Sequence, residues 1–142
     1  MKLKFKKLDD SAIIPKRSRT GDAAFDISSS EDVLLKPQSR HLTNTSVAIE
    51  IEDGYCGLVL PRSGNAVNHG ITVINTPGLI DSNYRGEIKI GLINTSKKDF
   101  NILKGDRIAQ LFIVPVCDVE VVETEELSES NRGDAGFGSS GR

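Results

Sequence analysis

Apolar residues in the first 122 positions alternate with polar or small residues, a period of two that is typical of strands with one buried face. The clearest segments are Val47, Ile49 and Ile51, then Cys56, Leu58 and Leu60, and then Ile88, Ile90 and Leu92. Turns rich in Gly, Asn, Asp or Lys follow or separate such segments, at residues 52–54, 75–78, 97–99 and 104–106. Many short strands with this spacing predict an all-β sandwich or barrel rather than βαβ units.

Two segments depart from the strand pattern. A single short helix is predicted at about residues 63–69, directly after a strand. From residue 123 onward Glu, Ser and Thr replace most apolar residues, which predicts a mobile tether. We therefore divide the chain into a β core at residues 1–122 and a tether with a flexible C-terminal tail at residues 123–142.

Composition narrows the class of protein. A chain of 142 residues is expected to form one domain. Aromatic residues are scarce at 5%, and the Val, Ile and Leu that dominate the apolar set suit a β-rich core. A formal net charge of -2 gives no general affinity for nucleic acid or an anionic membrane. Any affinity for anions must therefore be local.

The location and the cysteines follow from simple patterns. The basic N-terminus is not followed by the apolar stretch of a signal peptide, and no apolar run approaches the length of a membrane span. We therefore expect a soluble, cytoplasmic protein with no membrane partner.

Cys56 and Cys117 stand alone in apparent strands, so we predict two core thiols rather than a disulfide or a metal site.

The last eleven residues combine groups that bind phosphate with an aromatic ring. Arg132 offers a bidentate cation, Gly138 a close backbone approach, Ser139 a hydroxyl donor and Phe137 a face for base stacking. The alternative for such a composition is a disordered Gly/Ser terminus.

Two short segments early in the chain interrupt the strand pattern with residues that a core does not need. Asp26 lies between apolar neighbours, where it is either a turn residue or a carboxylate that holds a hydrated cation. Arg62, Ser63 and Gly64 follow a strand and open the predicted helix. They form either an ordinary N-cap or a phosphate site, and taken singly the N-cap is favoured.

Two later segments of this kind also allow a structural or a functional interpretation. Residues 75–87 are predicted to form a hairpin that presents Asp81 and Tyr84 near its tip. Asp81 either deprotonates a water or, with Asn83, simply makes the turn. Residues 104–106 predict a turn followed by a strand, in which only Gln110, flanked by apolar residues, suggests a function.

Taken together and in this order, these four segments and the C-terminal tail resemble the five motifs of the homotrimeric deoxyuridine triphosphatase family, the dUTPases. The resemblance extends from about Pro15 to Arg142. The matching segments are Ala24-Phe25-Asp26-Ile27, Pro61-Arg62-Ser63-Gly64, residues 78–86, residues 105–111 and residues 132–141. One such motif is weak evidence, whereas five in register are strong.

The resemblance implies hydrolysis of dUTP to dUMP and pyrophosphate, which keeps uracil out of DNA and supplies dUMP for thymidylate. It also implies a distorted antiparallel β-barrel of jelly-roll type, the β-clip fold. Three chains would form a homotrimer with shared active sites. In each site the first, second and fourth motifs would come from one chain, the third from another and the tail from the third.

The resemblance also assigns roles to single residues. Asp81 would activate the attacking water, Tyr84 would exclude a 2′-hydroxyl, and Asp26 would meet Mg²⁺ through water. Arg132 would act on the γ-phosphate during catalysis. The remaining substrate contacts would be Arg62, Ser63, Gly64, Asn75, Gly78, Leu79, Ile80, Lys89, Gln110, Phe137, Gly138 and Ser139.

Some positions depart from the family's usual pattern, and two alternative functions stay open. Ala135, Asn65 and Ser140 replace a common Gly, Leu and Thr, but none removes a group that the chemistry needs. The alternatives are an enzyme like dCTP deaminase on a related fold, and a nucleotide sensor or protein-binding module without activity. The retained Asp and Arg residues argue against the module, and Asp81, Tyr84 and the stacking tail argue against the deaminase.

Overall fold

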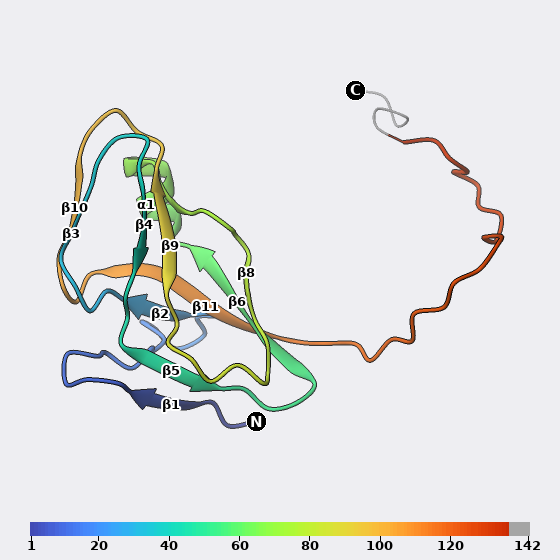
Figure 1. The fold of residues 1–142 in the computed structure, drawn as a ribbon, viewed down its shortest axis with the longest axis horizontal. Coiled ribbons are helices and arrows are strands. Elements are labelled where there is room, and N and C mark those ends of the chain that lie inside the picture. Colours follow the sequence, from blue (N-terminus) through green and yellow to red (C-terminus); the bar gives the residue numbers. More distant parts are fainter. Residues whose placement is uncertain (137–142) are drawn as a thin grey trace.

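The computed structural model describes residues 1–136, which form eleven strands and one helix (Figure 1). The strands are β1 (Lys4–Lys7), β2 (Phe25–Ser28), β3 (Val33–Leu35), β4 (Arg40–Thr43), β5 (Val47–Glu50), β6 (Tyr55–Pro61), β7 (Ile71–Val73), β8 (Gly78–Ile80), β9 (Ile90–Asn94), β10 (Phe100–Ile102) and β11 (Arg107–Pro115). The helix, α1, spans Ser63–His69. The predicted all-β class is therefore confirmed, together with the single short helix at its predicted residues.

The strands form four small antiparallel sheets rather than a closed barrel in the described part of the chain. The largest has the order β2-β11-β6-β8, the next β4-β9-β7, and the others pair β1 with β5 and β3 with β10. Neighbours in these sheets are mostly distant in sequence, as in a jelly roll. The long strand β11 is central, since it pairs with β2 on one side and with β6 on the other.

The core is built almost entirely from Val, Ile and Leu, which branch and pack well on pleated surfaces. Its buried members are Ile27, Val33, Leu35, Ile49, Ile51, Val59, Ile71, Val73, Ile80, Ile88, Ile90, Leu92, Ile102, Ile108, Ala109 and Leu111. Of the predicted alternating sets, those at residues 47–51 and 88–92 supply core residues as expected.

Of the set predicted to be buried in β6, only Cys56 is buried. Gly57 and Val59 are buried against the core, whereas Leu58 and Leu60 on the other face are only half-buried. A Cβ at Gly57 would lie 2.9 Å from Leu111 Cδ1, so glycine leaves room for the Leu111 side chain. Because apolar residues occupy both faces of β6, periodicity could not show which face points inward.

The predicted hairpin at residues 75–87 is also wrong. Gly78–Ile80 forms β8, which pairs with β6 rather than with the chain that follows it. Residues 81–87 form a loop, closed by a hydrogen bond from the Tyr84 hydroxyl to the Glu87 carbonyl at 2.8 Å. The Glu87 carboxylate in turn accepts hydrogen bonds from the Thr45 and Ser46 N–H groups, at 3.2 and 2.8 Å. This loop is therefore tied to the turn between β4 and β5.

The start of α1 differs from the N-cap prediction. Arg62 is the N-cap residue and makes no side-chain capping bond, so Ser63 is already the first helical residue. The helix ends at His69, and the residue that caps it is Gly70, whose φ of 69° favours glycine.

The two cysteines differ from each other. Cys56 is buried in β6 as predicted, but Cys117 is exposed just after β11, so the prediction of two core thiols is wrong for Cys117. Cys117 lies after the end of β11 at Pro115, so its apolar neighbours in the sequence do not bury it.

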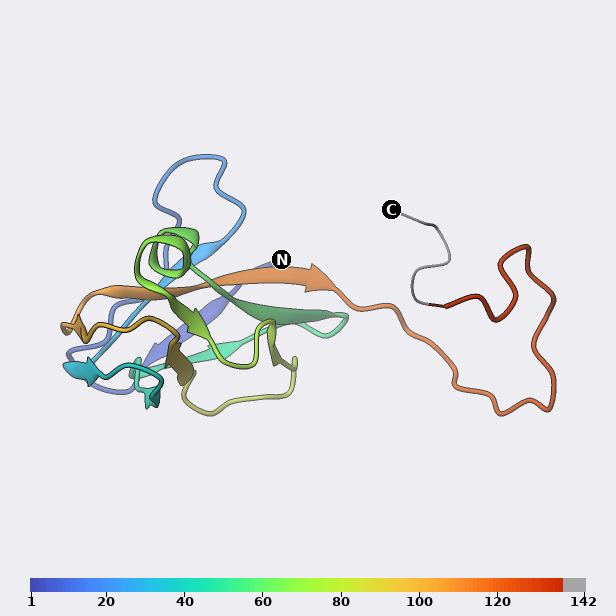
Figure 2. The same cartoon turned by 90° about the horizontal axis from the view of Figure 1, so that it is seen from above.

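Beyond β11 the chain leaves the body and extends away from it up to residue 136 (Figures 1 and 2). Val119, Val121 and Val122 are exposed along this segment. The division of the chain at residue 122 stays a prediction. Among residues 1–136 no helix combines the length and apolar character needed to cross a membrane.

Candidate active site

Alternation along the central sheet places one group of functional side chains on its outer face. Asp26 of β2 is directly opposite Gln110 of β11, which is opposite Leu60 of β6. Residues opposite each other across a ladder share a face, while Ile27 and Leu111 on the other face are buried in the core. Asp26 can stand between apolar residues in the sequence because its side chain faces outward while theirs face the core.

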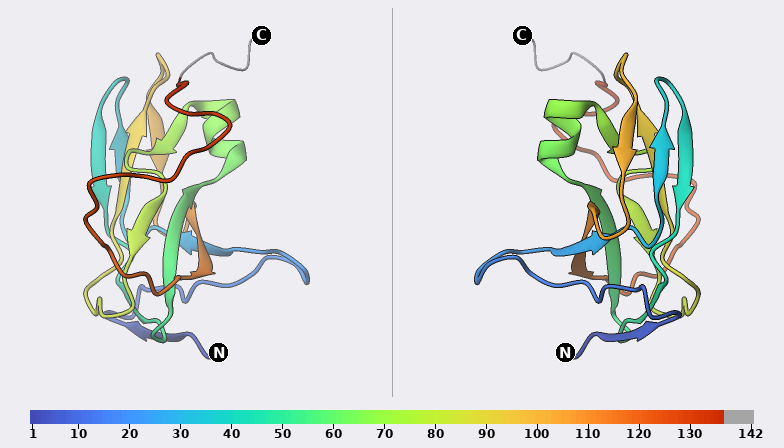
Figure 3. Two further views of the ribbon diagram at one scale, coloured as in Figure 1. Left: turned by 90° about the vertical axis from the view of Figure 1, so that its right-hand side faces the viewer. Right: turned by 90° about the vertical axis from the view of Figure 1, so that its left-hand side faces the viewer.

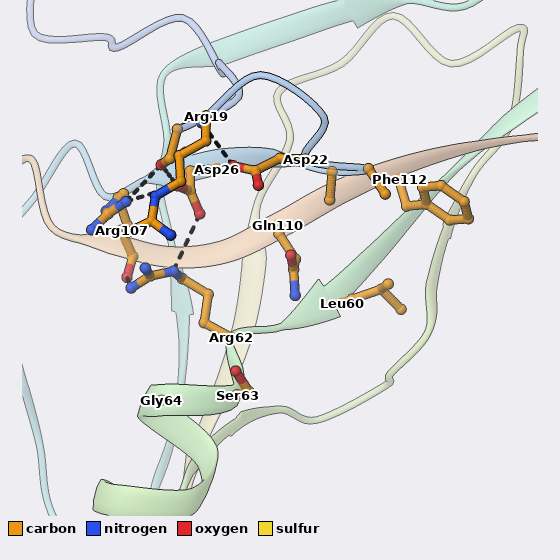
Figure 4. Close-up of a pocket in the computed structure, with 13 residues that line it drawn as sticks. Arg19, Asp22, Asp26, Leu60, Arg62, Ser63, Gly64, Arg107, Gln110 and Phe112 are labelled. Carbon is orange, nitrogen blue, oxygen red and sulfur yellow. Dashed lines mark hydrogen bonds and ion pairs between the residues drawn. The ribbon is translucent and has the colours of Figure 1, made fainter.

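This outer face forms the floor of a pocket of about 740 Å³, here called the arginine pocket (Figure 4). The loop between β1 and β2 stands out from the body (Figures 2 and 3). Its residues Ser18, Arg19 and Asp22 supply one wall of the pocket. The pocket is lined by Ser18, Arg19, Asp22, Ala23, Ala24, Asp26, Leu60, Arg62, Ser63, Gly64, Arg107, Gln110 and Phe112.

Asp26 is the centre of the hydrogen bonds in this pocket. Its Oδ1 accepts from Arg62 Nε at 3.2 Å, and its Oδ2 accepts from Arg107 Nη1 at 2.9 Å and from Ser18 Oγ at 2.6 Å. The Ser18 hydroxyl oxygen also accepts from Arg107 Nη1 at 2.8 Å. Two guanidinium groups are thus held side by side on one carboxylate.

The pKa of Asp26 is lowered from its ordinary value. Partial burial raises the pKa, but the hydrogen bonds from Ser18 and Arg107 and the charges of Arg62 and Arg107 together outweigh burial. The carboxylate is therefore ionised at neutral pH and partly offsets the positive charge of the pocket.

Asp26 also fits a hydrated cation. A carboxylate has about four acceptor positions, and three are used by the bonds above, which leaves one on Oδ1. Residues 1–136 contain no group of three His, Cys, Asp or Glu side chains that could hold a metal directly. The donor set therefore suits contact through a water of a cation that is held mainly by another ligand.

The other predicted residues of this pocket are fixed by the backbone. Gln110 Nε2 donates to the Pro61 carbonyl at 2.9 Å, and Arg62 Nη1 donates to the Arg107 carbonyl at 3.3 Å. Ser63 and Gly64 lie at the start of α1 and are exposed. The predicted group Asp26, Arg62, Ser63, Gly64 and Gln110 is thus brought together in one pocket.

A second pocket of about 340 Å³, here called the β8 pocket, collects the predicted residues of the third motif. Its apolar floor includes Val59 and Ile90, and its rim holds the exposed side chains of Asp81 and Tyr84. The predicted residues that line it are Asn75, Gly78, Leu79, Ile80, Asp81, Tyr84 and Lys89. A Cβ at Gly78 would lie 3.2 Å from Asn75 Nδ2, so glycine gives the Asn75 amide its room. Lys89 Nζ lies 3.6 Å from Glu87 Oε2, which draws this cation toward the loop.

No described residue lines both pockets. Leu60 lines the arginine pocket and Val59 lines the β8 pocket, and consecutive residues of a strand point to opposite faces. The central sheet thus separates the two pockets within one chain.

The tail lies apart from both pockets in the described part of the chain. Arg132 Nε donates to the Ala135 carbonyl at 2.8 Å, and Arg132 lines neither pocket. The predicted contacts Phe137, Gly138 and Ser139 lie outside the described residues.

Four residues that shape these pockets were not predicted from the sequence. They are Ser18, Arg19, Arg107 and Glu87. Arg107 stands in the Gly-Asp-Arg segment that was taken for a turn and a strand, so its signal was present. Ser18 and Arg19 lie in a loop without a motif, and no sequence signal marks them.

Comparison with known proteins extends along nearly the whole chain. The dUTPase family model matches residues 10–141. A deoxyuridine 5'-triphosphate nucleotidohydrolase from Nautilia profundicola is 55% identical over 142 residues and covers 100% of both chains. One from Tropheryma whipplei is 50% identical over 129 residues, which are 90% of this chain and 88% of that protein.

Solved structures give the same fold. The Staphylococcus bacteriophage 80alpha dUTPase with dUPNHPP has a TM-score of 0.93 and 35% identity, and the match covers 99% of each chain. A mutant dUTPase from phage phi11 of S. aureus, described with a structural Mg(II) ion, has a TM-score of 0.85 and 30% identity, over 91% of this chain and 100% of that one. These matches confirm the predicted jelly-roll type of fold, and the chain belongs to the dUTPase family.

Proposed function

We propose that this chain hydrolyses dUTP to dUMP and pyrophosphate. The observation that carries the proposal is that the two pockets present different kinds of binding group. The arginine pocket presents fixed cations suited to a polyphosphate, and the β8 pocket presents backbone groups, an aromatic ring and one exposed carboxylate. A nucleoside triphosphate is the kind of ligand that needs both sets of groups.

In the proposed reaction Asp81 takes a proton from a water molecule. The water oxygen forms a bond to the α-phosphorus, and the bond from that phosphorus to the oxygen that bridges to the β-phosphorus breaks. The electron pair of the broken bond leaves with pyrophosphate. A positioned general base of this kind contributes about 10²- to 10⁴-fold to the rate.

Specificity for deoxyuridine would come from the β8 pocket. Asn75 and the backbone of Gly78, Leu79 and Ile80 would bond to the edge of uracil, so that cytosine meets mispaired groups. Tyr84, held by its hydroxyl to the Glu87 carbonyl, would lie against the sugar and exclude a 2′-hydroxyl. Lys89 would be a secondary contact because Glu87 already attracts it.

The phosphates would lie in the arginine pocket, against Arg62, Ser63, Gly64 and Gln110. Mg²⁺ bound to the triphosphate would neutralise phosphate charge, and the remaining acceptor position of Asp26 would hold one of its waters. Asp26 meanwhile keeps Arg62 and Arg107 in place.

A complete site would require a homotrimer. Within one chain the central sheet separates the two pockets, and the described tail lies in neither. The β8 pocket of one chain would therefore face the arginine pocket of another. The tail of the third would close the site, with Arg132 on the γ-phosphate, Phe137 on uracil, and Gly138 and Ser139 as donors.

Release of pyrophosphate and ammonia from each dNTP and from UTP tests the activity. We expect pyrophosphate from dUTP alone, and no release by Asp81→Asn above about a hundredth of the normal rate. Ammonia from dCTP would instead support a deaminase, and nucleotide binding without any product would support a sensor.

Mixed trimers test the shared site. A chain that lacks residues 131–142 and a full-length Asp81→Asn chain should each be inactive as pure trimers, for different reasons. Refolding equal amounts together should restore activity at about a quarter of the sites, because random assortment pairs an intact Asp81 with an intact tail at that frequency. No recovery in trimers whose mixed mass is confirmed would contradict a site shared in this way.

A further inference from the structure

Ser18 lies in the loop between β1 and β2, outside every motif that the sequence suggested. Its side chain nevertheless touches the two charged groups at the centre of the arginine pocket. The hydroxyl donates to Asp26 Oδ2 at 2.6 Å and accepts from Arg107 Nη1 at 2.8 Å. The single hydroxyl proton is used in the first bond, so this group has no donor left for a phosphate.

The loop that carries Ser18 is held to the body by further contacts. The Arg17 guanidinium lies 4.8 Å from the centre of the Phe25 ring, a cation–π distance. The Arg19 N–H donates to Asp22 Oδ2 at 2.8 Å, which closes the turn that follows Ser18. A turn that is fixed to the body therefore holds Ser18 beside Asp26.

The bonds around Ser18 also determine which arginine donors face the pocket. A guanidinium has five N–H donors. Arg107 uses two of them on Ser18 and Asp26, and Arg62 uses two on Asp26 and the Arg107 carbonyl. Within residues 1–136 each arginine therefore keeps three N–H donors that no protein group accepts, and Ser18 and Asp26 together orient those of Arg107.

On the basis of the proposed function, we infer that Ser18 is a positioning residue for the pyrophosphate part of the substrate. It acts by holding the Arg107 guanidinium and the Asp26 carboxylate in register with Arg62. The Arg107 side chain is 49% exposed, so without the hydroxyl it has one anchor fewer against solvent and more freedom to turn away. Binding of the outer phosphates then pays the entropy of ordering that side chain.

The test is the affinity of three matched variants for two ligands, measured by titration calorimetry with Mg²⁺ present. Ser18→Ala removes the hydroxyl, Ser18→Thr keeps it, and Thr20→Ala removes a hydroxyl of the same loop for which no hydrogen bond is found among the described residues. The ligands are the α,β-imido analogue of dUTP and dUMP, which lacks the outer phosphates.

We expect Ser18→Ala to weaken the analogue by about 3- to 10-fold, the range of one lost hydrogen bond. The affinity for dUMP should change by less than about 2-fold, because its base and sugar lie in the other pocket. Ser18→Thr and Thr20→Ala should bind both ligands as the unchanged chain does. In hydrolysis the loss for Ser18→Ala should appear in KM more than in kcat.

A double-mutant cycle shows whether Ser18 acts through Arg107. In an Arg107→Ala background, Ser18→Ala should have little further effect on the analogue, since the group that it positions is already gone.

Equal losses for the analogue and for dUMP, or no loss for the analogue, would overturn the positioning role of Ser18. Full additivity in the double-mutant cycle would also overturn it. If the unchanged chain failed to bind the analogue at all, the proposed function itself would fall, which is a separate result.

Discussion

The two pockets of this chain are built in opposite ways. In the arginine pocket, Ser18 of the β1–β2 loop and two arginines, Arg62 just after β6 and Arg107 at the start of β11, are held together by Asp26 of β2. In the β8 pocket the walls are backbone and core residues, and the side chains of Asp81 and Tyr84 are exposed at the rim. One pocket is ordered by ionic contacts and the other by its position on the core.

This difference follows from what each pocket would bind. A polyphosphate is recognised by charge, and guanidinium groups are effective only when their planes are already oriented. A base is recognised by its edge, for which strand backbone supplies rigid donors and acceptors without help from charge. In the proposed site the reacting carboxylate, Asp81, would lie with the groups that read the base, and within one chain it lies across the sheet from the cations.

The sharpest test of the comparison is Asp81→Asn. Asn keeps the shape of the side chain but cannot accept a proton from water, so kcat should fall by about 10²- to 10⁴-fold. Because Asp81 is exposed at the rim of the β8 pocket, the melting temperature and the affinity for the imido analogue should stay near those of the unchanged chain. Stopped-flow proton release and calorimetry measure these quantities. Near-normal turnover would remove Asp81 from the mechanism.

Asp26→Asn breaks the other pocket and should have the next largest effect. Asn cannot balance two guanidinium groups, so Arg62 and Arg107 lose their common anchor. We expect kcat/KM to fall by about ten- to a hundredfold, the range for hydrogen bonds to a charged group.

The matched comparison is between KM and kcat in the two variants. The loss in Asp26→Asn should appear mainly in KM and in the affinity for the analogue, whereas that in Asp81→Asn should appear in kcat. If both variants lost only kcat, the two pockets would not divide binding and chemistry as described.

A change outside both pockets should alter stability alone. Thr43 is fully buried in β4, and its hydroxyl has no hydrogen-bond partner among residues 1–136. Thr43→Val replaces that hydroxyl with a methyl group and should raise the free energy of unfolding by about 1 kcal/mol. Chemical denaturation measures the gain, and kcat should be unchanged. Lower stability would mean that the hydroxyl is satisfied by a group such as buried water.

The smallest expected effect concerns pH. The pKa of Asp26 is lowered in the folded chain, so folding favours its ionised form. That contribution to stability is present above the ordinary aspartate value of 3.8 and is lost as the pH falls through the lower folded value. The difference in melting temperature between the unchanged chain and Asp26→Asn should therefore shrink as the pH is lowered from 7 toward 3. A difference that grows on acidification would contradict the assigned direction.

Local signals in the sequence predicted local structure well. The helix at residues 63–69 and the strand after residues 104–106 depend on neighbouring residues, and both were predicted. The predicted hairpin at residues 75–87 failed because β8 pairs with β6, about twenty residues earlier in the chain. A turn-rich segment between apolar residues has the same pattern whether its strand pairs locally or with a distant partner.

By itself the sequence determined the all-β class, the position of the helix and the chemical types of most site residues, because these depend on periodicity, turns and motifs. Only the tertiary structure decided that Asp26, Arg62 and Arg107 meet around Ser18, that Cys117 is exposed, and that the sheet separates the two pockets. The physical reason is that pairing register and face are set by contacts between strands far apart in the chain, and a one-residue difference in register moves a side chain to the other side of the sheet.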